Sequence, residues 1–389
     1  MGSEDTRLPP DTLPGYGSRM VRRWLLYGAN GFTGRRIAAE AVARGLSPVL
    51  AGRSAEAVAA VAEETALEWR AFPLDDPAAL DAGLEGVAAV LLAAGPFSAT
   101  SAPVVEACLR RGIHYLDITG EIPVFEAVFA RDAEAKRRGA LLLPGVGFDV
   151  VPTDCLAVRL ARALPRADRL ELAFASGGGP SAGTAKTMVE GLARGGAVRE
   201  GGRIRREPHG ARRRTIPFAD RPRRGMSIPW GDVATAYRST GIPNIVVYTP
   251  GPGWLPPLAR VARPVLGVGP VRRLAQRAIE RRVRGPAEEG RSRLWGRASQ
   301  ADGAAVEGTG ETPGGYAFTA LSAVECAERL LAVEWPPGAW TPASLFGPEL
   351  LEAIPGCRLD VGAAEPAGGA DGTDGGDTRG STSEQGGST

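Results

Sequence analysis

The chain has 389 residues, a net charge of +2 and a hydrophobic fraction of 43%. Its length predicts two or three domains that bury a substantial core. The near-neutral charge argues against a strongly electrostatic nucleic-acid binder, and no apolar run reaches the roughly 18 residues that a membrane-spanning helix needs. Four cysteines without CxxC spacing and two isolated histidines argue against a disulfide framework and a metal site. The sequence does not open on a signal-peptide pattern, so we expect a cytoplasmic protein.

The composition divides the chain into five parts. Residues 1–21 are rich in Pro, Gly and charge, and residues 362–389 are mostly Gly, Ser, Thr, Asp and Ala. Neither segment can bury enough apolar area to offset the entropy of ordering, so we predict a disordered leader and a disordered tail. Between them we expect an α/β domain over 22–150, an α+β domain over 151–312, and a return to the first domain over 313–361.

Short apolar runs alternate with longer amphipathic segments in the first domain. This alternation predicts a doubly wound parallel sheet of the Rossmann type, with right-handed crossovers. The strands are expected at 24–27, 48–51, 69–72, 87–93, 114–118 and 140–143. The helices are expected at 32–44, 55–64, 101–111 and 123–138.

The pattern changes in the second domain. Residues 170–175 alternate like a strand, and residues 184–194 have the spacing of a helix. Two strand-like runs, 293–299 and 304–309, flank Asp302-Gly303, which predicts a hairpin. The amphipathic run 318–333 predicts a long helix that packs on the first domain.

A glycine-rich loop, Gly28-Ala29-Asn30-Gly31-Phe32-Thr33-Gly34, follows the first predicted strand and opens the first predicted helix. This context predicts a pyrophosphate-binding turn. Gly28 permits the tight turn, Gly31 lets the backbone approach the phosphates, and Gly34 lets the helix pack close to the sheet. The helix N-terminus supplies amide groups for the anion. The remaining loop residues expected at the cofactor are Asn30, Phe32 and Thr33.

The end of the second predicted strand indicates which dinucleotide is bound. An acidic residue there would bind the ribose 2′-hydroxyl of NAD, but the sequence has Arg53 and Ser54. These residue types suit a 2′-phosphate, so we predict NADP, with an ordinary surface arginine as the alternative reading of Arg53. The fourth predicted strand is followed by Gly95, Pro96 and Phe97, which are expected to line the same crevice.

Two further strand ends carry candidate residues for chemistry. Alternation places Tyr115 and Asp117 on one face of the fifth strand, where either could donate a proton or bind substrate. The alternative for Asp117 is a carboxylate that fixes a loop. Gly147 and Asp149, and Asp154 shortly after them, lie where the chain leaves the first domain, and they could contact the nicotinamide or cap the next helix, with Asp154 as the candidate N-terminal cap. In the second domain, Thr184 and Lys186 are expected to bind an anionic substrate group at a helix N-terminus, although a solvated Lys186 is the commoner case.

Two basic stretches need a separate interpretation. Residues 194–224 carry eleven arginines against three acids, and residues 255–284 carry eight against one. The second stretch has the composition of a basic amphipathic segment, so contact with the inner face of a membrane is one hypothesis and a solvated helix is the other. Phe218 is the only Phe, Tyr or Trp in the two stretches, so there is no platform for stacking bases, and we expect no nucleic-acid partner.

Eight stretches together carry a family resemblance. They are GANGFTG at 28–34, LAGRS at 50–54, AAGPFS at 93–98, EACLRRGIHYLDITGE at 106–121, LPGVGFDVVPTD at 143–154, IPWGDVATAYRSTGIPNIVVY at 228–248, WGRASQADG at 295–303 and GYAFTALSAVECAERLL at 315–331. In this order, over about residues 23–350, they resemble the saccharopine dehydrogenase-like NADP-binding family, in particular its bacterial short forms. The resemblance implies a Rossmann domain, a second domain inserted after the sixth strand, and a C-terminal return. The family includes saccharopine reductases and trans-acting enoyl reductases of mycobacterial lipid synthesis.

The sequence therefore predicts an NADP(H)-dependent oxidoreductase that reduces a C=C or C=N bond of a lipid-like or amino-acid-like substrate. An extended short-chain dehydrogenase is disfavoured, because no Tyr in the chain is followed four positions later by the Lys which that class uses. A non-catalytic NADP(H) sensor or scaffold remains the alternative. The second domain is a candidate for substrate binding or for contacts within a homodimer.

Overall fold

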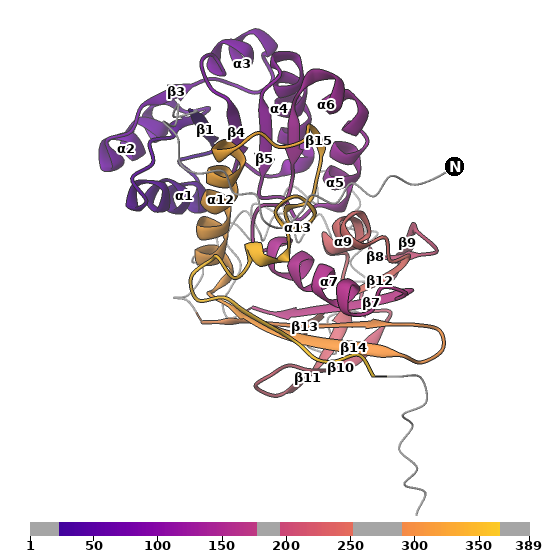
Figure 1. Ribbon diagram of the computed structural model, residues 1–389. Coiled ribbons are helices and arrows are strands. Elements are labelled where there is room, and N and C mark those ends of the chain that lie inside the picture. The colour runs from indigo at the N-terminus through magenta and orange to yellow at the C-terminus, as the bar shows by residue number, and fades with distance from the viewer. Residues whose placement is uncertain (1–22, 177–194, 252–289, 366–389) are drawn as a thin grey trace, which may run out of the picture.

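The computed structural model describes residues 23–176, 195–251 and 290–365. Figure 1 shows two layers of the molecule, with a sheet wrapped by helices above and a broad second sheet below. The predicted parallel sheet is confirmed, since the described strands of the first domain are ordered β15-β6-β5-β4-β1-β2-β3 and every pairing in it is parallel.

The strands of the first sheet are short and apolar, because both of their faces are covered by helices. Leu26 and Leu50 face the side covered by α1, whereas Leu25 and Tyr27 face the opposite side. The strands are β1 (Trp24–Tyr27), β2 (Val49–Gly52), β3 (Trp69–Ala71), β4 (Ala89–Leu92), β5 (His114–Asp117), β6 (Leu141–Leu143) and β15 (Gly338–Ala339).

Most predicted helices of the first domain are present, with three differences. The predicted helix over 123–138 is two helices, α4 begins at Phe97 rather than at residue 101, and α3 was not predicted. The helices are α1 (Phe32–Ala43), α2 (Ala55–Thr65), α3 (Pro77–Gly83), α4 (Phe97–Arg111), α5 (Ile122–Phe129) and α6 (Asp132–Arg138).

The second sheet is mixed, as expected for an α+β domain. Its described strands are ordered β10-β11-β12-β7-β13-β14-β16, and β8 and β9 branch from β12. The predicted hairpin around Asp302-Gly303 is confirmed by the antiparallel pairing of β13 with β14. The strands are β7 (Arg169–Ala175), β8 (Gly196–Glu200), β9 (Arg203–Glu207), β10 (Arg213–Pro217), β11 (Pro222–Ser227), β12 (Asn244–Pro250), β13 (Ser292–Ser299), β14 (Ala305–Thr312) and β16 (Arg358–Val361).

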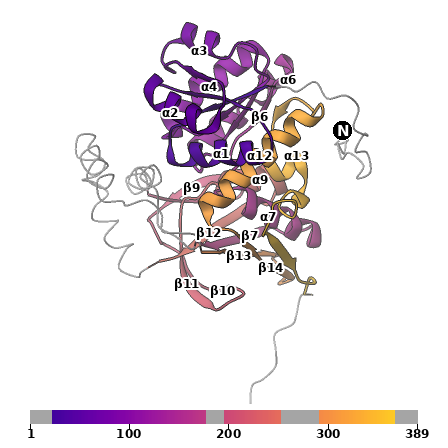
Figure 2. The ribbon, with the colours of Figure 1, turned by 90° about the vertical axis from the view of Figure 1, so that its left-hand side faces the viewer.

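Helices fill the space between the two sheets. One face of the second sheet packs against α7, which also contacts α9 and α13. The long helix α12 runs from the second sheet along the first domain and packs against α1, as both Figure 1 and Figure 2 show. The elements are α7 (Val151–Ala163), α9 (Asp232–Thr240), α12 (Gly315–Ala332), α13 (Pro342–Phe346) and the short 3-10 helix η1 (Pro348–Leu350).

The C-terminal segment serves both domains. After α12, the strand β15 pairs with β6 in the first sheet, as a return to that domain requires. The chain then crosses back, and β16 pairs with β14 in the second sheet. Glu365 also pairs with Ala305, so contacts with β14 continue beyond residue 362, where the predicted tail begins. Residues 366–389 and the predicted leader lie outside the described residues.

Candidate functional site

The glycine-rich loop between β1 and α1 lies tightly against the backbone around it. Gly28 has a φ of +90°, and a Cβ there would lie 2.8 Å from the amide nitrogen of Ala94. A Cβ on Gly34 would lie 2.1 Å from the carbonyl oxygen of Gly28, so both positions require glycine. Gly31 is the N-cap of α1, and no side chain at this cap accepts a hydrogen bond from the first amides of the helix. This cradle, open at a helix N-terminus, fits a pyrophosphate.

The other residues of the loop connect it to neighbouring elements. The Asn30 side chain leans onto the end of β2, where its Oδ1 lies 3.0 Å from the position of a Cβ on Gly52. Thr33 is half-buried in the first turn of α1. The Phe32 ring is 40% exposed and packs edge to face against Tyr316 of α12, with 5.1 Å between ring centroids. The loop is therefore held by β2 on one side and by α12 on the other.

Arg53 and Ser54 lie at the carboxyl end of β2, beside the glycine-rich loop. Arg53 is exposed, and among the described residues no carboxylate pairs with it. Burial raises the pKa of Tyr27 to about 12 while the charge of Arg53 acts in the opposite direction, which places Arg53 near the end of β1 as well. The Ser54 hydroxyl caps α2 by accepting a hydrogen bond from the Ala57 amide at 3.3 Å. An unpaired cation at this point fits a 2′-phosphate on the adenosine ribose.

The turn after β4 contains Gly95, Pro96 and Phe97 and leads directly into α4. The carboxylate of Glu121 caps this helix by accepting hydrogen bonds from the amides of Phe97 at 2.8 Å and Ser98 at 3.2 Å. Because a carboxylate already satisfies these amides, the N-terminus of α4 does not offer them to an anionic ligand. No pattern near residue 97 predicts this role of Glu121, because the two positions are more than twenty residues apart in the chain.

Tyr115 and Asp117 lie together on one face of β5, as predicted, but both side chains are fully buried. The Tyr115 hydroxyl donates to Asp117 Oδ2 at 2.6 Å, and the amides of Thr119 and Gly145 donate to Oδ1 at 2.9 and 2.8 Å. Burial raises the pKa of Asp117 to about 6, and these three hydrogen bonds oppose the rise. Burial also raises the pKa of Tyr115 well above its ordinary value. The geometry supports the loop-fixing alternative for Asp117, and a catalytic role for either residue stays a prediction.

Residues 147–149 form the start of the crossover between the domains. Gly147 lies close to α12, where a Cβ would be 3.0 Å from a methyl group of Thr319. The Phe148 amide donates to the hydroxyl of Thr319 at 3.1 Å, so α12 fixes the position of this loop. Asp149 lies against Gly120 after β5, with Oδ2 only 2.3 Å from the position of a Cβ on that glycine. Burial raises the pKa of Asp149 to about 7.

Two more carboxyl groups are buried behind this loop. Asp154 is not the N-cap of α7, as one reading of the sequence had it, because the cap is Val150. Asp154 instead accepts hydrogen bonds from Ser239 Oγ at 2.5 Å and from the Ala343 amide at 3.3 Å, so it joins α7 to α9 and α13. Asp232, in the first turn of α9, is also fully buried, and its two oxygens have no hydrogen-bond partner within the described residues. Burial raises the pKa of both carboxyl groups.

Aromatic rings gather where the two domains meet. Phe148 packs edge to face against Phe174 of β7 and Phe318 of α12, with centroid separations of 5.8 and 6.0 Å. Phe174 also contacts Trp230, which precedes α9, at 4.5 Å. Phe148 and Phe174 are almost completely buried, whereas Trp230 is half-buried. The crossover loop thus has an apolar, aromatic wall beside Asp149.

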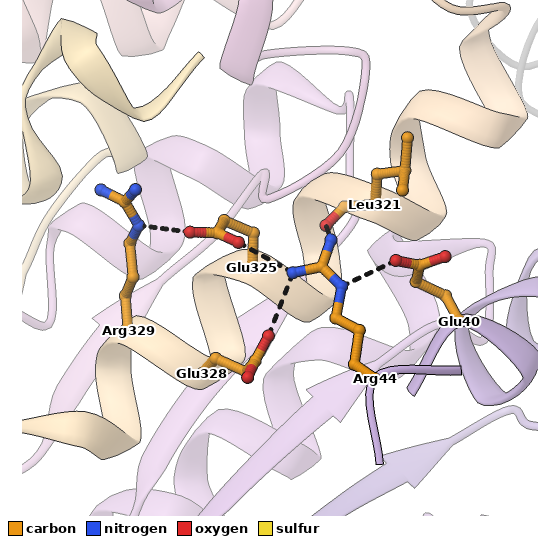
Figure 3. Close-up of polar contacts among 6 residues, drawn as sticks. All are labelled: Glu40, Arg44, Leu321, Glu325, Glu328 and Arg329. Atoms are coloured by element: carbon orange, nitrogen blue, oxygen red, sulfur yellow. Dashed lines mark hydrogen bonds and ion pairs between the residues drawn. The ribbon is translucent and has the colours of Figure 1, made fainter. Parts of the chain in front are cut away.

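A charged cluster fastens α12 to α1, as Figure 3 shows. Arg44, the C-cap of α1, pairs with Glu40 of its own helix at 2.7 Å and with Glu325 and Glu328 of α12 at 2.8 and 3.0 Å. Burial alone would lower the pKa of Arg44, but the three carboxylates raise it above its ordinary value. Because α12 also holds the crossover loop and packs on the glycine-rich loop, the cluster supports both sides of the candidate site.

Several predicted features lie outside the described residues, namely Thr184, Lys186, the helix 184–194 and the basic segment 255–284. Within the described parts of the chain, no helix is long and apolar enough to cross a membrane, and no group of three acidic, His or Cys side chains could hold a metal ion. The four cysteines are free, and three of them are buried.

Comparisons with known proteins find similarity to the first domain. Residues 24–143 match the family model described as the saccharopine dehydrogenase NADP binding domain. A trans-acting enoyl reductase of Mycobacterium leprae is 35% identical over 152 residues, which are 36% of this chain and 35% of that protein. A saccharopine dehydrogenase-like oxidoreductase of Bos taurus is 29% identical over 150 residues, which are 33% of this chain and 35% of that protein. The matched stretch therefore spans less than half the length of each relative.

One solved structure resembles the fold over most of the chain. The apo saccharopine dehydrogenase (L-Glu forming) of Saccharomyces cerevisiae aligns with a TM-score of 0.61 and 13% identity, covering 88% of this chain and 100% of that chain. At this identity the match concerns the fold alone, and it includes the second domain as well as the parallel sheet. The family-model match, in contrast, covers residues 24–143, the part of the chain that carries the glycine-rich loop and Arg53.

Proposed function

We propose that the chain is an NADP(H)-dependent oxidoreductase, because residues 24–143 match the family model described as the saccharopine dehydrogenase NADP binding domain. Its proposed reaction is the reduction of a C=C bond in an apolar, acyl-type substrate. Reduction of a C=N bond in an amino-acid-like substrate is the second candidate. The observation that carries the choice between them is the half-buried ring of Trp230, which lies against the buried aromatic rings of Phe174 and Phe148 beside the crossover loop.

The cofactor half of the proposal rests on the geometry of the strand ends. The loop from Gly28 to Gly34 leaves room for a pyrophosphate, and Arg53 lies at the end of β2 without a protein carboxylate partner among the described residues. NADPH, when bound, supplies the hydride. The protein must then hold the substrate in register, exclude water and provide a proton.

The substrate half of the proposal rests on the wall and on the names of relatives. Trp230 is the ring of this wall that keeps exposed surface, and an apolar acyl chain that covers it gains about 25 cal/mol for each Å² removed from water. A zwitterionic amino acid would need charged partners instead. The mycobacterial relative is named as a trans-acting enoyl reductase, which agrees with an acyl-type substrate.

The test is NADPH oxidation, followed by absorbance, with a panel of trans-2-enoyl thioesters of increasing chain length, cyclic imines and 2-oxo acids with amines. We expect turnover of enoyl thioesters, with KM falling as the chain lengthens, and slower turnover with NADH in place of NADPH. Turnover of the imines alone would favour the amino-acid-like substrate. Tight NADPH binding without turnover of any panel member would support the non-catalytic sensor instead.

Two further properties remain proposals. Peripheral contact with the inner membrane face through residues 255–284 predicts that the protein sediments with anionic vesicles and that added salt releases it. A homodimer formed through the second domain predicts a concentration-dependent mass in analytical ultracentrifugation. If the protein does not sediment with the vesicles at any salt concentration, the membrane contact is excluded. If its mass stays that of a monomer at every protein concentration, the homodimer is excluded.

A further inference from the structure

The position of Asp149 on the sheet places it at one end of the dinucleotide site. The strand order reverses between β1 and β4, and dinucleotides bind across that point at the carboxyl ends of the strands. Arg53 at the end of β2 marks the adenosine side. The nicotinamide side therefore lies over β4, β5 and β6, and Asp149 follows β6 in the loop that lies against the end of β5.

In the described part of the chain, the carboxyl group of Asp149 has no partner, and unlike that of Asp232, which also has none, it is not fully buried. Asp117, Glu121 and Asp154 each accept two or more hydrogen bonds that fix loops or helices. Within the described residues, Asp149 has no hydrogen bond or ion pair. It is half-buried rather than enclosed, and Gly120 is the residue that leaves it room. A carboxyl group without a structural task, accessible at the nicotinamide side, is available for chemistry.

We propose that Asp149 faces the nicotinamide and is the catalytic residue that donates the proton of the reaction. This inference rests on the proposed function for its substrate, but its placement beside the cofactor does not. For a C=C bond, the hydride from NADPH adds to one carbon, and the O–H bond of the Asp149 carboxyl breaks as its proton forms a C–H bond on the adjacent carbon. The substrate gains two electrons and two hydrogens, and NADPH is oxidised to NADP⁺. Asp149 is left as a carboxylate, which solvent protonates again.

The surroundings of Asp149 suit a group that changes protonation near neutral pH. Burial raises its pKa to about 7. The charged group of the described residues that interacts with Asp149 is acidic, namely Asp232 in the first turn of α9. No basic side chain of the described residues lowers its pKa. The positive ring of NADP⁺ would favour the carboxylate, whereas the neutral ring of NADPH would not.

The test is the binding of both cofactor forms across pH, which requires no substrate. We expect the ratio of the Kd for NADP⁺ to the Kd for NADPH to fall roughly tenfold as pH rises through 7, which corresponds to one pKa unit of coupling. The 2′-phosphate titrates in both ligands, so it cancels in the ratio. In Asp149→Asn the ratio should be constant with pH. The matched control is Glu56→Gln, an exposed carboxylate of α2, which should keep the wild-type slope.

A flat ratio in the wild-type protein overturns the proposal, and so does an unchanged slope in Asp149→Asn. If Asp149→Asn does not fold, Gly120→Ala is the second variant, because its Cβ would displace the carboxyl group and should abolish the slope. A wild-type slope without turnover of any panel substrate would refute the proposed function but leave Asp149 beside the nicotinamide. Turnover with a flat ratio would refute the role of Asp149 alone.

Discussion

Replacing Arg44 with methionine removes the cation that three carboxylates of α1 and α12 share. An exposed ion pair is worth about 0–1 kcal/mol, and breaking a buried one costs about 3–5 kcal/mol. The Arg44 side chain is 21% exposed, and those of Glu325 and Glu328 are 18% and 28% exposed, so the cluster lies between these limits. We expect Arg44→Met to lower the free energy of unfolding by about 2 kcal/mol, because it leaves like charges facing one another.

The measurement is thermal unfolding followed by circular dichroism, where this loss should lower the midpoint by roughly 3 °C. Arg35→Met is the matched control, since it removes the same charge from the same helix. Arg35 pairs with Glu64 at 2.8 Å, but the two side chains are 41% and 62% exposed. Its loss should cost less than about 0.5 kcal/mol.

A double-mutant cycle of Arg44→Met with Glu325→Gln isolates the contact between α1 and α12, and we expect a coupling of about 1 kcal/mol. Burial raises the pKa of Glu325, but Arg329 and Arg44 lower it below its ordinary value. The ion pairs of Glu325 therefore stabilise the fold fully above the unfolded pKa of a glutamate, about 4.3, and this stability is lost as pH falls through the folded pKa of Glu325. If Arg44→Met costs no more than Arg35→Met, or if the coupling is near zero at neutral pH, the cluster does not hold α12.

Three further predictions concern the cofactor site. Gly34→Ala places a Cβ 2.1 Å from the Gly28 carbonyl oxygen, so it should lower both the unfolding midpoint and the affinity for NADPH. In Gly31→Ala the new Cβ lies 3.2 Å from the same oxygen, so this variant should keep the unfolding midpoint and lose affinity for NADPH in a fluorescence titration. Arg53→Asp should weaken binding of NADPH far more than binding of NADH, and equal losses would reject the 2′-phosphate assignment. The raised pKa of Asp149, about 7, gives stability that is present below its unfolded pKa of about 3.9 and is lost as pH rises through 7. Asp149→Asn should therefore gain in unfolding midpoint relative to wild type as pH rises from about 4 to about 7, and a constant difference in differential scanning fluorimetry would contradict the raised pKa.

The sequence predicts the elements whose signals are local. The strand β1, the turn at Gly28 and the helix α1 follow from an apolar run, a glycine spacing and a helical period within twenty residues. The hairpin of β13 and β14 follows equally from Asp302-Gly303. The placement of Tyr115 and Asp117 on one face follows from strand alternation alone.

The elements that the sequence mispredicts depend on distant partners. The start of α4 at Phe97 depends on the carboxylate of Glu121, which no local pattern near residue 97 reveals. The predicted helix 123–138 has no Gly or Pro at its break, yet α6 begins at Asp132, whose carboxylate accepts a hydrogen bond from the amide of Ala339 in β15. The sequence also does not predict that Asp149 lacks a hydrogen bond or ion pair within the described residues, because this depends on which neighbouring groups already have partners.

The last part of the chain supplies an edge strand to each sheet. β15 pairs with β6 at the edge of the first sheet, and β16 pairs with β14 at the edge of the second. A chain emerges from the ribosome with its N-terminus first, so neither sheet is complete until residues 338–361 have been synthesised. Until that moment β6 and β14 expose unpaired backbone groups, which are templates for pairing between chains. Ribosomes that stall or terminate within this short stretch would therefore release a protein with two open sheet edges, and aggregation of such products is the consequence of sharing one C-terminal segment between two domains.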